Sequence, residues 1–187
     1  MTTVGVLALQ GDFREHLAVL ETIGVDAIPV KTPEALSGVD ALIIPGGEST
    51  TIGKMSVRFG LIDPLRSTIS DGLPVYGTCA GLIFMAASLS DGDQPLLGVL
   101  DVVVKRNAFG RQNDSFEASL DIAGLDDPFD AVFIRAPWVE KVGSDVDILA
   151  SVAEHPVMVR QEKILATSFH PELTGDTRIH QMLLDMV

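Results

Sequence analysis

The chain has 187 residues, and its composition already excludes several classes of protein. Its 26 acidic residues outnumber its 13 basic ones, and the net charge of −13 makes nucleic acid and anionic membranes poor partners. Apolar residues make up 47% of the chain, enough for a well-buried core, and the length favours one domain over residues 1–187. The lone cysteine and the lack of a secretory signal or membrane-helix pattern predict a cytoplasmic protein.

The first half of the chain alternates short apolar runs with helical patterns. Residues 4–9 are apolar almost without interruption, as in a strand buried on both faces. Residues 13–23 carry apolar side chains at helical spacing, and Gly24 ends that helix. Thr32 followed by Pro33 has the form of a helix start. The pattern also predicts strands at 27–30, 41–44 and 74–76, and helices at 50–59, 61–70 and 80–89.

The second half contains many expected strands with few helices between them. The strands are expected at 99–104, 116–120, 131–134, 146–152, 157–160 and 164–167, with a last helix at 177–186. Together the two halves predict an α/β protein of three layers, with a mostly parallel central sheet, helices on both faces and an antiparallel strand extension. Ligands of such sheets bind beyond the carboxyl ends of the strands. The loops expected there are 10–11, 45–51 and 77–81.

The only cysteine lies in the run Gly77-Thr78-Cys79-Ala80-Gly81, between an expected strand and an expected helix. Gly-x-Cys-x-Gly at such a corner has the form of a nucleophile elbow with cysteine in place of serine. Its small neighbours permit a tight turn that would place the sulfur at a helix start, where free N–H groups favour a thiolate. The N–H of Ala80 could then donate to an oxyanion. The alternative is that Cys79 is a small core residue, as most free cysteines are.

His170 is the best candidate for a base, because it follows an expected strand and precedes Pro171 and Glu172. Pro171 disfavours helix at His170, and positions two apart in an extended segment face the same way. His170 and Glu172 would then share one pocket, with the carboxylate orienting the imidazole. The alternative is a loop histidine beside a solvated glutamate. The other histidines are expected in the first helix (His16), in a polar turn (His155) and on the surface of the last helix (His180).

GTCAG together with SFHPE resembles the class I, triad-type glutamine amidotransferases. Within them, the chain is similar to the family of glutaminase subunits of pyridoxal 5'-phosphate synthase, on the runs VGVLALQGDFREH, LIIPGGEST, VVVKRNAFGRQNDSFEA and FIRAPWV. The resemblance extends from residue 4 nearly to the end of the chain and implies the flavodoxin-like fold of class I amidotransferases. It also implies hydrolysis of L-glutamine to L-glutamate and ammonia through a γ-glutamyl thioester, with the ammonia channelled to a synthase subunit.

The resemblance implies that Cys79, His170 and Glu172 form the catalytic triad, with Gly47 and Ala80 as the oxyanion hole. Zwitterionic glutamine needs a cation for its carboxylate, and the arginines at the ends of expected strands are candidates. The glutamine-binding set implied by the resemblance is Gln10, Gly47, Glu48, Ser49, Arg106, Ile134 and Arg135, while Arg111 stays unassigned.

The expected partners are L-glutamine and a synthase subunit of the PdxS/SNZ type in a large hetero-oligomer, with no nucleic acid and no membrane. The resemblance further implies that the isolated chain is a poor glutaminase, because the partner sets the oxyanion loop. The sequence has no CxxC, HExxH, GxGxxG or P-loop lysine motif, so we expect no metal and no bound cofactor.

Three alternatives remain at the level of sequence. The first is a glutaminase subunit of another synthase, such as imidazole glycerol phosphate synthase. The second is an α/β-hydrolase-like esterase, although in that fold the acid usually lies between the nucleophile and the histidine. The third is a non-enzymatic binding or chaperone module of similar fold, in which Cys79 senses redox state.

Overall fold

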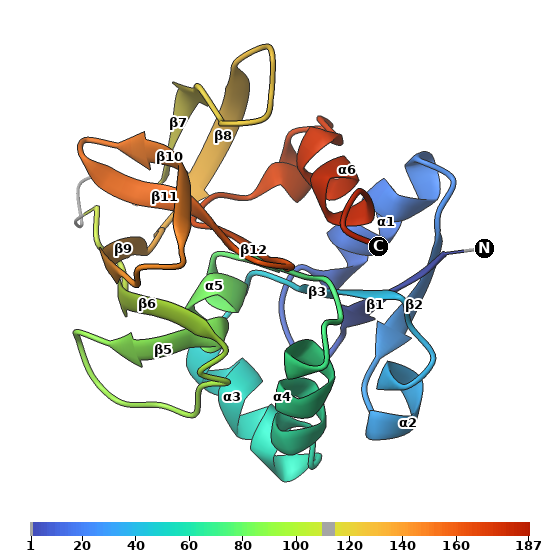
Figure 1. The fold of residues 1–187 in the computed structure, drawn as a ribbon. Coiled ribbons are helices and arrows are strands. Elements are labelled where there is room, and N and C mark those ends of the chain that lie inside the picture. Colours follow the sequence, from blue (N-terminus) through green and yellow to red (C-terminus); the bar gives the residue numbers. More distant parts are fainter. Residues whose placement is uncertain (1, 110–114) are drawn as a thin grey trace.

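A seven-stranded sheet forms the centre of the molecule, as described for residues 2–109 and 115–187 in a computed structural model (Figure 1). Its parallel strands are β1 (Thr3–Leu7), β2 (Asp26–Val30), β3 (Ala41–Ile44), β4 (Val75–Thr78) and β12 (Ile164–Thr167). Two antiparallel strands, β10 (Asp147–Val152) and β11 (His155–Gln161), extend it beyond β12. The order is β10-β11-β12-β4-β3-β1-β2, and its parallel part follows the flavodoxin-like pattern.

Helices cover both faces of this sheet because its central strands are apolar on both sides. In β3, Ala41 and Ile43 face one core cluster while Leu42 and Ile44 face the other. The first cluster also contains residues of α1 (Phe13–Thr22) and α6 (Arg178–Leu184). The second contains residues of α2 (Pro33–Leu36), α3 (Ser49–Arg58), α4 (Ile62–Ser70) and α5 (Ala80–Met85). Figure 1 shows the two groups of helices on opposite sides of the sheet, which confirms the expected three-layer architecture.

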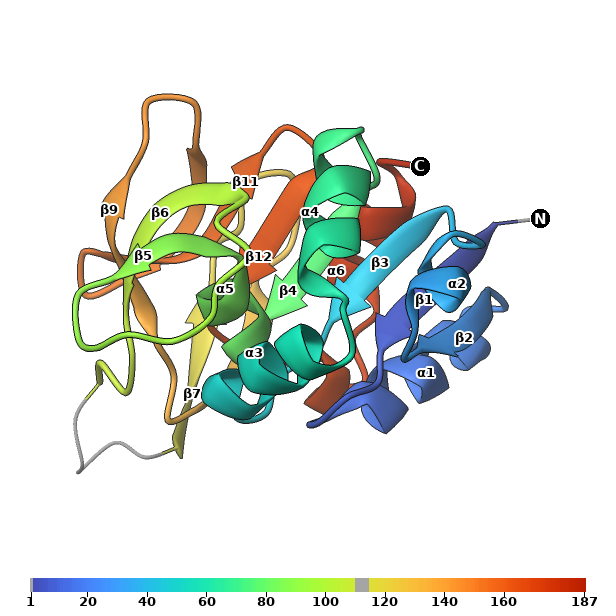
Figure 2. The same cartoon turned by 90° about the horizontal axis from the view of Figure 1, so that it is seen from below.

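The remaining strands form the expected extension at one end of the molecule, and its pairs are antiparallel except for the parallel pair of β5 with β6. One small sheet contains β5 (Ala86–Leu89), β6 (Leu100–Lys105) and β9 (Trp138–Val142). A second consists of the hairpin of β7 (Ser115–Leu120) and β8 (Phe129–Ile134). In Figure 2 these strands lie at the end of the molecule opposite β1 and β2.

The helix expected at 80–89 is wrong in its second half. The helix α5 ends at Met85, Ala86 has an extended ψ of 151°, and β5 then pairs in parallel with β6. The run is apolar throughout, so its pattern fits a buried helix and a buried strand equally well, and only the pairing with β6 decides. Strand β9 was also not expected from sequence; the other elements lie within a few residues of their predicted bounds.

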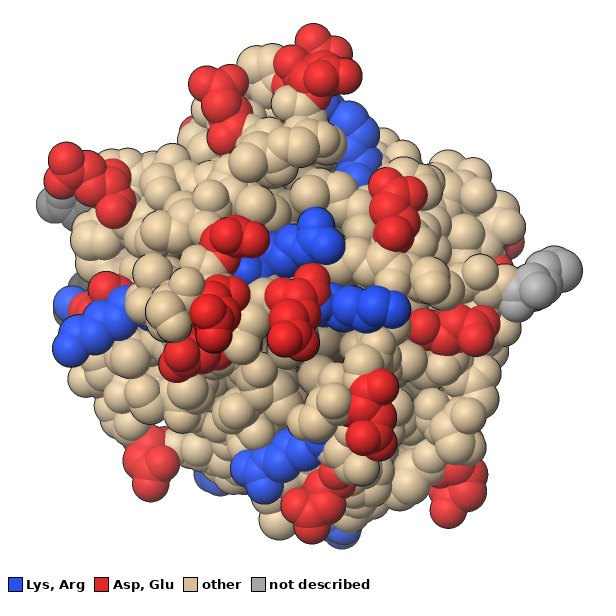
Figure 3. Space-filling model, viewed as in Figure 1, with Lys and Arg blue, Asp and Glu red and all other residues tan. Residues whose placement is uncertain are grey.

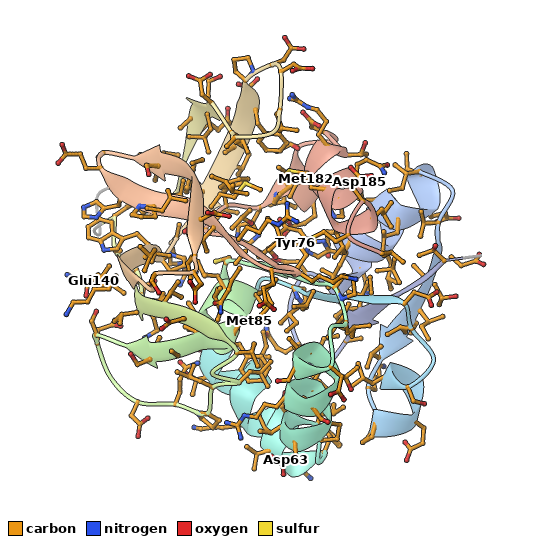
Figure 4. The ribbon with its side chains drawn as sticks, viewed as in Figure 1. Asp63, Tyr76, Met85, Glu140, Met182 and Asp185 are labelled. Atoms are coloured by element: carbon orange, nitrogen blue, oxygen red, sulfur yellow. The ribbon has the colours of Figure 1, made fainter. Side chains whose placement is uncertain are left out.

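Within residues 2–109 and 115–187, no helix combines the length and apolarity needed to cross a membrane. The acidic side chains on the face seen in Figure 3 are spread over its edge and centre, with Lys and Arg side chains between them. Figure 4 likewise shows Asp63 and Glu140 at the periphery, whereas Tyr76 and Met85 lie in the interior on opposite sides of the sheet.

Candidate active site

Four loops meet at the carboxyl edge of the parallel sheet, because β1, β3, β4 and β12 are parallel and adjacent. They bring Gln10, Gly47, Cys79 and His170 into one cleft of about 610 Å³. A volume of this size suits a small polar ligand with room for water. The other residues that line the cleft are Asp12, Glu48, Ser49, Ile83, Arg106, Asn107, Ile134, Arg135 and Leu173.

Cys79 has the backbone of a nucleophile elbow. It lies between β4 and α5 with φ of 48° and ψ of −99°, a conformation that costs a non-glycine residue about 1–3 kcal/mol. The N–H of Cys79 donates to the carbonyl oxygen of Thr167 at 2.8 Å, which ties the elbow to β12. Residue 81, in the first turn of α5, must be glycine, because a Cβ there would collide with the carbonyl oxygen of Ile44. The thiol is buried against the cleft, with Sγ 4.0 Å from the carbonyl oxygen of Ile134.

Ala80 occupies the first position of α5, directly after the nucleophile candidate. The N–H groups of the first helical turn have no acceptor within their own helix. The N–H of Ala80 is therefore suited to donate to an oxygen atom that develops charge beside Cys79.

His170 and Glu172 form a close buried pair, with 2.7 Å between His170 Nδ1 and Glu172 Oε1. Burial lowers the pKa of His170, but hydrogen bonds and charge interactions with Cys79 and Glu172 outweigh it and raise that pKa to about 10. The expected extended segment is wrong beyond His170, because Pro171–Leu173 is a 3-10 turn, η2. His170 itself is not helical, which is expected because proline disfavours helix in the residue before it. The tight turn after His170 brings Glu172 back to the imidazole.

The loop after β3 is held against the loop after β1 by two hydrogen bonds. Asp12 N–H donates to the carbonyl oxygen of Gly46 at 3.0 Å, and Glu48 N–H donates to Gln10 Oε1 at 2.7 Å. Gly46 packs so closely on the imidazole that a Cβ there would lie 2.5 Å from His170 Cε1. The candidate oxyanion residue Gly47 is thus set by the position of residues 10–12.

Asp12 is a cleft residue that the sequence did not single out. Its Oδ2 lies 3.7 Å from His170 Nδ1. Burial raises the pKa of Asp12, although the positive charge of His170 partly offsets this. Its position two residues after Gln10, in a loop at the carboxyl edge, is the signal that could have identified it.

The opposite side of the cleft carries the candidate glutamine-binding arginines. Arg106 follows β6 and is oriented by an ion pair with Asp91, 3.5 Å between Nε and Oδ1, and by donation from Nη1 to Gln94 Oε1 at 3.1 Å. Gln94 also accepts from Ser49 Oγ at 3.1 Å, so this amide, which the sequence analysis did not predict, links two predicted site residues.

Arg135, the second candidate arginine, follows β8 with φ of 44° and is exposed. Arg111 lies outside the described residues.

Glu48 lines the cleft, but its carboxylate caps α3. It accepts from Thr50 N–H at 3.1 Å and from Thr51 N–H at 2.8 Å. Burial raises the pKa of Glu48, but the hydrogen bonds from Thr51 and Thr50 prevail and lower it. Its side chain is thus committed to the helix, while its N–H donates to Gln10 Oε1 and its carbonyl oxygen accepts from Ile52 N–H.

Two expectations about the other histidines are wrong. His180 is not a surface residue, because it is fully buried and lies 3.0 Å from His16, Nε2 to Nδ1. Helix α6 packs against the sheet with the face that carries His180. Because α6 is short and has no side-chain cap, its sequence did not show which face is buried. His155 is not in a turn but begins β11, where its ring stacks on Trp138 at 3.6 Å between centroids.

Among residues 2–109 and 115–187, Asp12, His170 and Glu172 form the one group of three or more acidic, histidine or cysteine side chains whose ligand atoms all lie within 4.8 Å of one another. The Nδ1 of His170 and the Oε1 of Glu172 already bond to each other. A cation at this place would have to break that bond, so the geometry favours a hydrogen-bonded dyad over a metal centre.

Comparisons with known proteins agree with this geometry. Residues 6–187 match the model of the SNO glutamine amidotransferase family. The chain is 58% identical to pyridoxal 5'-phosphate synthase subunit PdxT of Mycobacteroides abscessus, over 98% of this chain and 96% of that protein. It is 56% identical to the protein of the same name from Streptomyces coelicolor, over 98% and 93%.

Solved structures extend the agreement to three dimensions. A crystal structure described as a glutamine amidotransferase superposes with a TM-score of 0.94 at 51% identity, covering 98% of this chain and 97% of that one. A protein in the structure of PurLQS from Thermotoga maritima superposes with a TM-score of 0.71 at 15% identity, over 98% and 97%, which shows a shared fold alone. The chain belongs to the SNO glutamine amidotransferase family.

Proposed function

We propose that this protein hydrolyses L-glutamine to L-glutamate and ammonia through a triad of Cys79, His170 and Glu172. The observation that carries the proposal is the strained cysteine elbow, which opens into the same cleft as a histidine already paired with a buried carboxylate. A nucleophile, a base and a group that orients the base are the three parts that acyl transfer requires. Residues 1–187 act in this proposal as one glutaminase domain.

The chemistry follows from these positions. The Cys79 thiolate attacks the side-chain amide carbon of glutamine, a carbon–sulfur bond forms, and the amide oxygen becomes an oxyanion. His170, as an imidazolium, gives a proton to the amide nitrogen; the carbon–nitrogen bond breaks, ammonia leaves and a γ-glutamyl thioester remains. Water then attacks the thioester while His170 takes its proton, and cleavage of the carbon–sulfur bond releases glutamate and restores the thiolate.

The remaining cleft residues supply stabilisation and binding. The N–H groups of Gly47 and Ala80 donate to the oxyanion, and loss of one such donor costs about 2.7–4 kcal/mol of barrier. Arg106 and Arg135 bind the α-carboxylate of glutamine, and Gln10, Glu48, Ser49 and Ile134 complete the pocket. No metal or organic cofactor has a step in this scheme.

The ammonia serves the synthesis of pyridoxal 5'-phosphate. Relatives that match this chain over nearly its whole length carry the name of a pyridoxal 5'-phosphate synthase subunit, which supports this destination. We place the protein in the cytoplasm, in a large hetero-oligomer with a PdxS/SNZ-type synthase subunit. The second candidate is a glutaminase for imidazole glycerol phosphate synthase, and the choice of partner separates the two.

The test is a reconstitution with each synthase subunit, with glutamine as the only nitrogen source. We expect glutamine-dependent product only with the synthase subunit that makes pyridoxal 5'-phosphate. Cys79→Ala should abolish this product, whereas added ammonium salt should restore it because the synthase itself is intact. Product from glutamine with Cys79→Ala, or from the imidazole glycerol phosphate partner, would overturn the proposal.

Activity of the isolated chain should be low, since the oxyanion loop depends on residues 10–12. Two hydrogen bonds join this segment to the oxyanion loop: Asp12 N–H donates to Gly46 at 3.0 Å, and Gln10 Oε1 accepts from Glu48 N–H at 2.7 Å. A partner that contacts residues 10–16 can therefore change the position of Gly47. Comparable glutamine turnover with and without the synthase would contradict this view.

A further inference from the structure

A buried polar cluster lies behind the triad, between the sheet and the pair of helices α1 and α6. Its centre is the contact between His16 Nδ1 and His180 Nε2 at 3.0 Å, and neither residue is exposed to solvent. The ring of Tyr76 meets both imidazoles edge-on, with centroids 6.3 Å from His16 and 6.0 Å from His180. Figure 4 shows Tyr76 in this interior position, beneath α6. No step of the glutaminase scheme uses these histidines.

His16 nevertheless reaches the triad from behind. Its Nε2 lies 3.6 Å from Glu172 Oε2 and 3.3 Å from the hydroxyl of Thr78, the residue before Cys79. Glu172 Oε1 is taken by His170, while Oε2 is buried and has no hydrogen-bond partner among the described residues. A carboxylate oxygen that is buried without a hydrogen-bond donor raises the free energy of the folded state. A nearby N–H therefore has a large effect on the position of this carboxylate.

The environment decides which nitrogen of His16 carries its proton. Burial and the nearby His180 and His170 hold the pKa of His16 well below its usual value, and burial lowers the pKa of His180 to about 4, so both rings are neutral near pH 7. A proton on Nδ1 of His16 would leave a lone pair facing the carboxylate of Glu172. A proton on Nε2 instead faces Glu172 Oε2, and Nδ1 then accepts from His180 Nε2–H. The same N–H also approaches the hydroxyl of Thr78, and the lone pair of His180 Nδ1 has no partner among the described residues.

We propose that His16 is a positioning residue for the triad. Its Nε2–H supports the second oxygen of Glu172, and His180 fixes the tautomer that makes this possible. The groups that face His16 are Glu172 and His170 from the loop after β12, Thr78 and Tyr76 from β4, and His180 from α6. The inference rests on the proposed glutaminase function, because it assigns His16 a part in holding the base of that reaction.

The activity test compares His16→Leu, His16→Gln and Leu20→Ala in the complex with the synthase subunit. Leu20 is fully buried one turn further along α1, so its truncation weakens the same helix without touching Glu172. We expect His16→Leu to lower kcat for glutamine roughly 10- to 100-fold, the range seen when a metal-bound histidine loses the group that orients it, with KM unchanged. His16→Gln, which keeps an N–H donor, should recover most of that loss, and Leu20→Ala should lower thermal stability but not kcat. Equal kcat for His16→Leu and wild type would overturn the proposal.

A second measurement uses the wild-type protein and does not depend on any variant folding. Nitrogen-15 NMR of labelled histidines reports which ring nitrogen of each imidazole is protonated. We expect His16 to be neutral and protonated on Nε2, with Nδ1 as a hydrogen-bond acceptor. Protonation on Nδ1, or a charged His16 near neutral pH, would overturn the proposal even if the protein is an active glutaminase. An inactive wild type with the expected tautomer would instead count against the proposed function.

Discussion

The two sides of the cleft are built differently. The side with the candidate triad comes from the edge of the central parallel sheet, and its three residues are 4–8% exposed. The side with the candidate glutamine-binding residues Arg106, Ile134 and Arg135 comes from β6 and β8 of the appended sheets, where the Arg106 side chain is 28% exposed and Ile134 is 38% exposed. Reactive groups need a rigid setting from which most water is excluded, because charges interact more strongly there. The groups that bind a charged substrate must instead be accessible from water, because the substrate arrives from solvent.

In the proposed reaction, the chemistry therefore takes place at the sheet edge, and the strands added to it supply the arginines that bind the α-carboxylate of glutamine. Changes on the first side should therefore act on kcat and on pH dependence. Changes on the second side should act on KM. The following experiments test this division.

The largest effect is expected for His170→Asn, which removes the base but preserves a hydrogen-bonding side chain. We expect kcat for glutamine in the synthase complex to fall by roughly 10⁴-fold or more, as for other triads. Binding of glutamine, measured by calorimetry, should persist because His170 does not hold the α-carboxylate. A fall in affinity as large as the fall in kcat would show that the division between the two sides is wrong.

The stability of the wild type should depend on pH through His170. Its folded pKa of about 10 exceeds the ordinary 6.5, so the stabilisation is complete below pH 6.5 and is lost as the pH rises through about 10. We expect the difference in unfolding free energy between wild type and His170→Asn to shrink by a few kcal/mol over this window, measured by urea unfolding. A difference that does not change with pH would mean that His170 is not held as a cation in the folded state.

Arg106→Ala tests the recognition side. Loss of a charged hydrogen-bond partner costs about 1.5–3 kcal/mol, so KM for glutamine should rise roughly 10- to 150-fold with little change in kcat. The matched control is Arg160→Ala, an exposed arginine of β11 that bonds the carbonyl oxygen of Glu162 and does not line the cleft. An equal change in both variants would indicate a general charge effect in place of a binding contact.

The smallest effect is expected for Glu48→Ala, which removes the cap of α3. The free energy of unfolding should fall by about 1 kcal/mol, the usual value of such a cap. The control is Glu140→Ala, since the pair of Glu140 with Lys105 at 3.9 Å is exposed and worth little. A much larger loss of glutamine affinity with Glu48→Ala would show that its carboxylate binds substrate after all.

Much of the fold and site could be predicted from local sequence. The uninterrupted apolar run at 41–44 predicts a strand buried on both faces, and the order of such runs predicts a parallel sheet. The small residues around Cys79 predict a tight corner. These features depend on neighbours within a few positions, so the sequence carries them directly.

Other features depend on contacts between distant segments. The run at 80–89 becomes a helix and then a strand because β6, which begins at Leu100, offers an edge for pairing. His180 was expected on the surface of the last helix, but its partner His16 lies 164 positions away in α1. Gln94 enters the site through the arrangement of loops, which no local pattern records.

The sequence by itself determined the parallel sheet and the cysteine corner, because both follow from short-range backbone geometry and apolar pattern. It also predicted that His170 lies beside Glu172, but the two residues meet through a 3-10 turn and not through the expected extended segment. The tertiary structure alone decided which groups surround that pair, which helix faces inward and how the oxyanion loop is held. Burial and hydrogen bonding between distant segments determine these features, since both depend on packing that is complete only when the whole chain has folded.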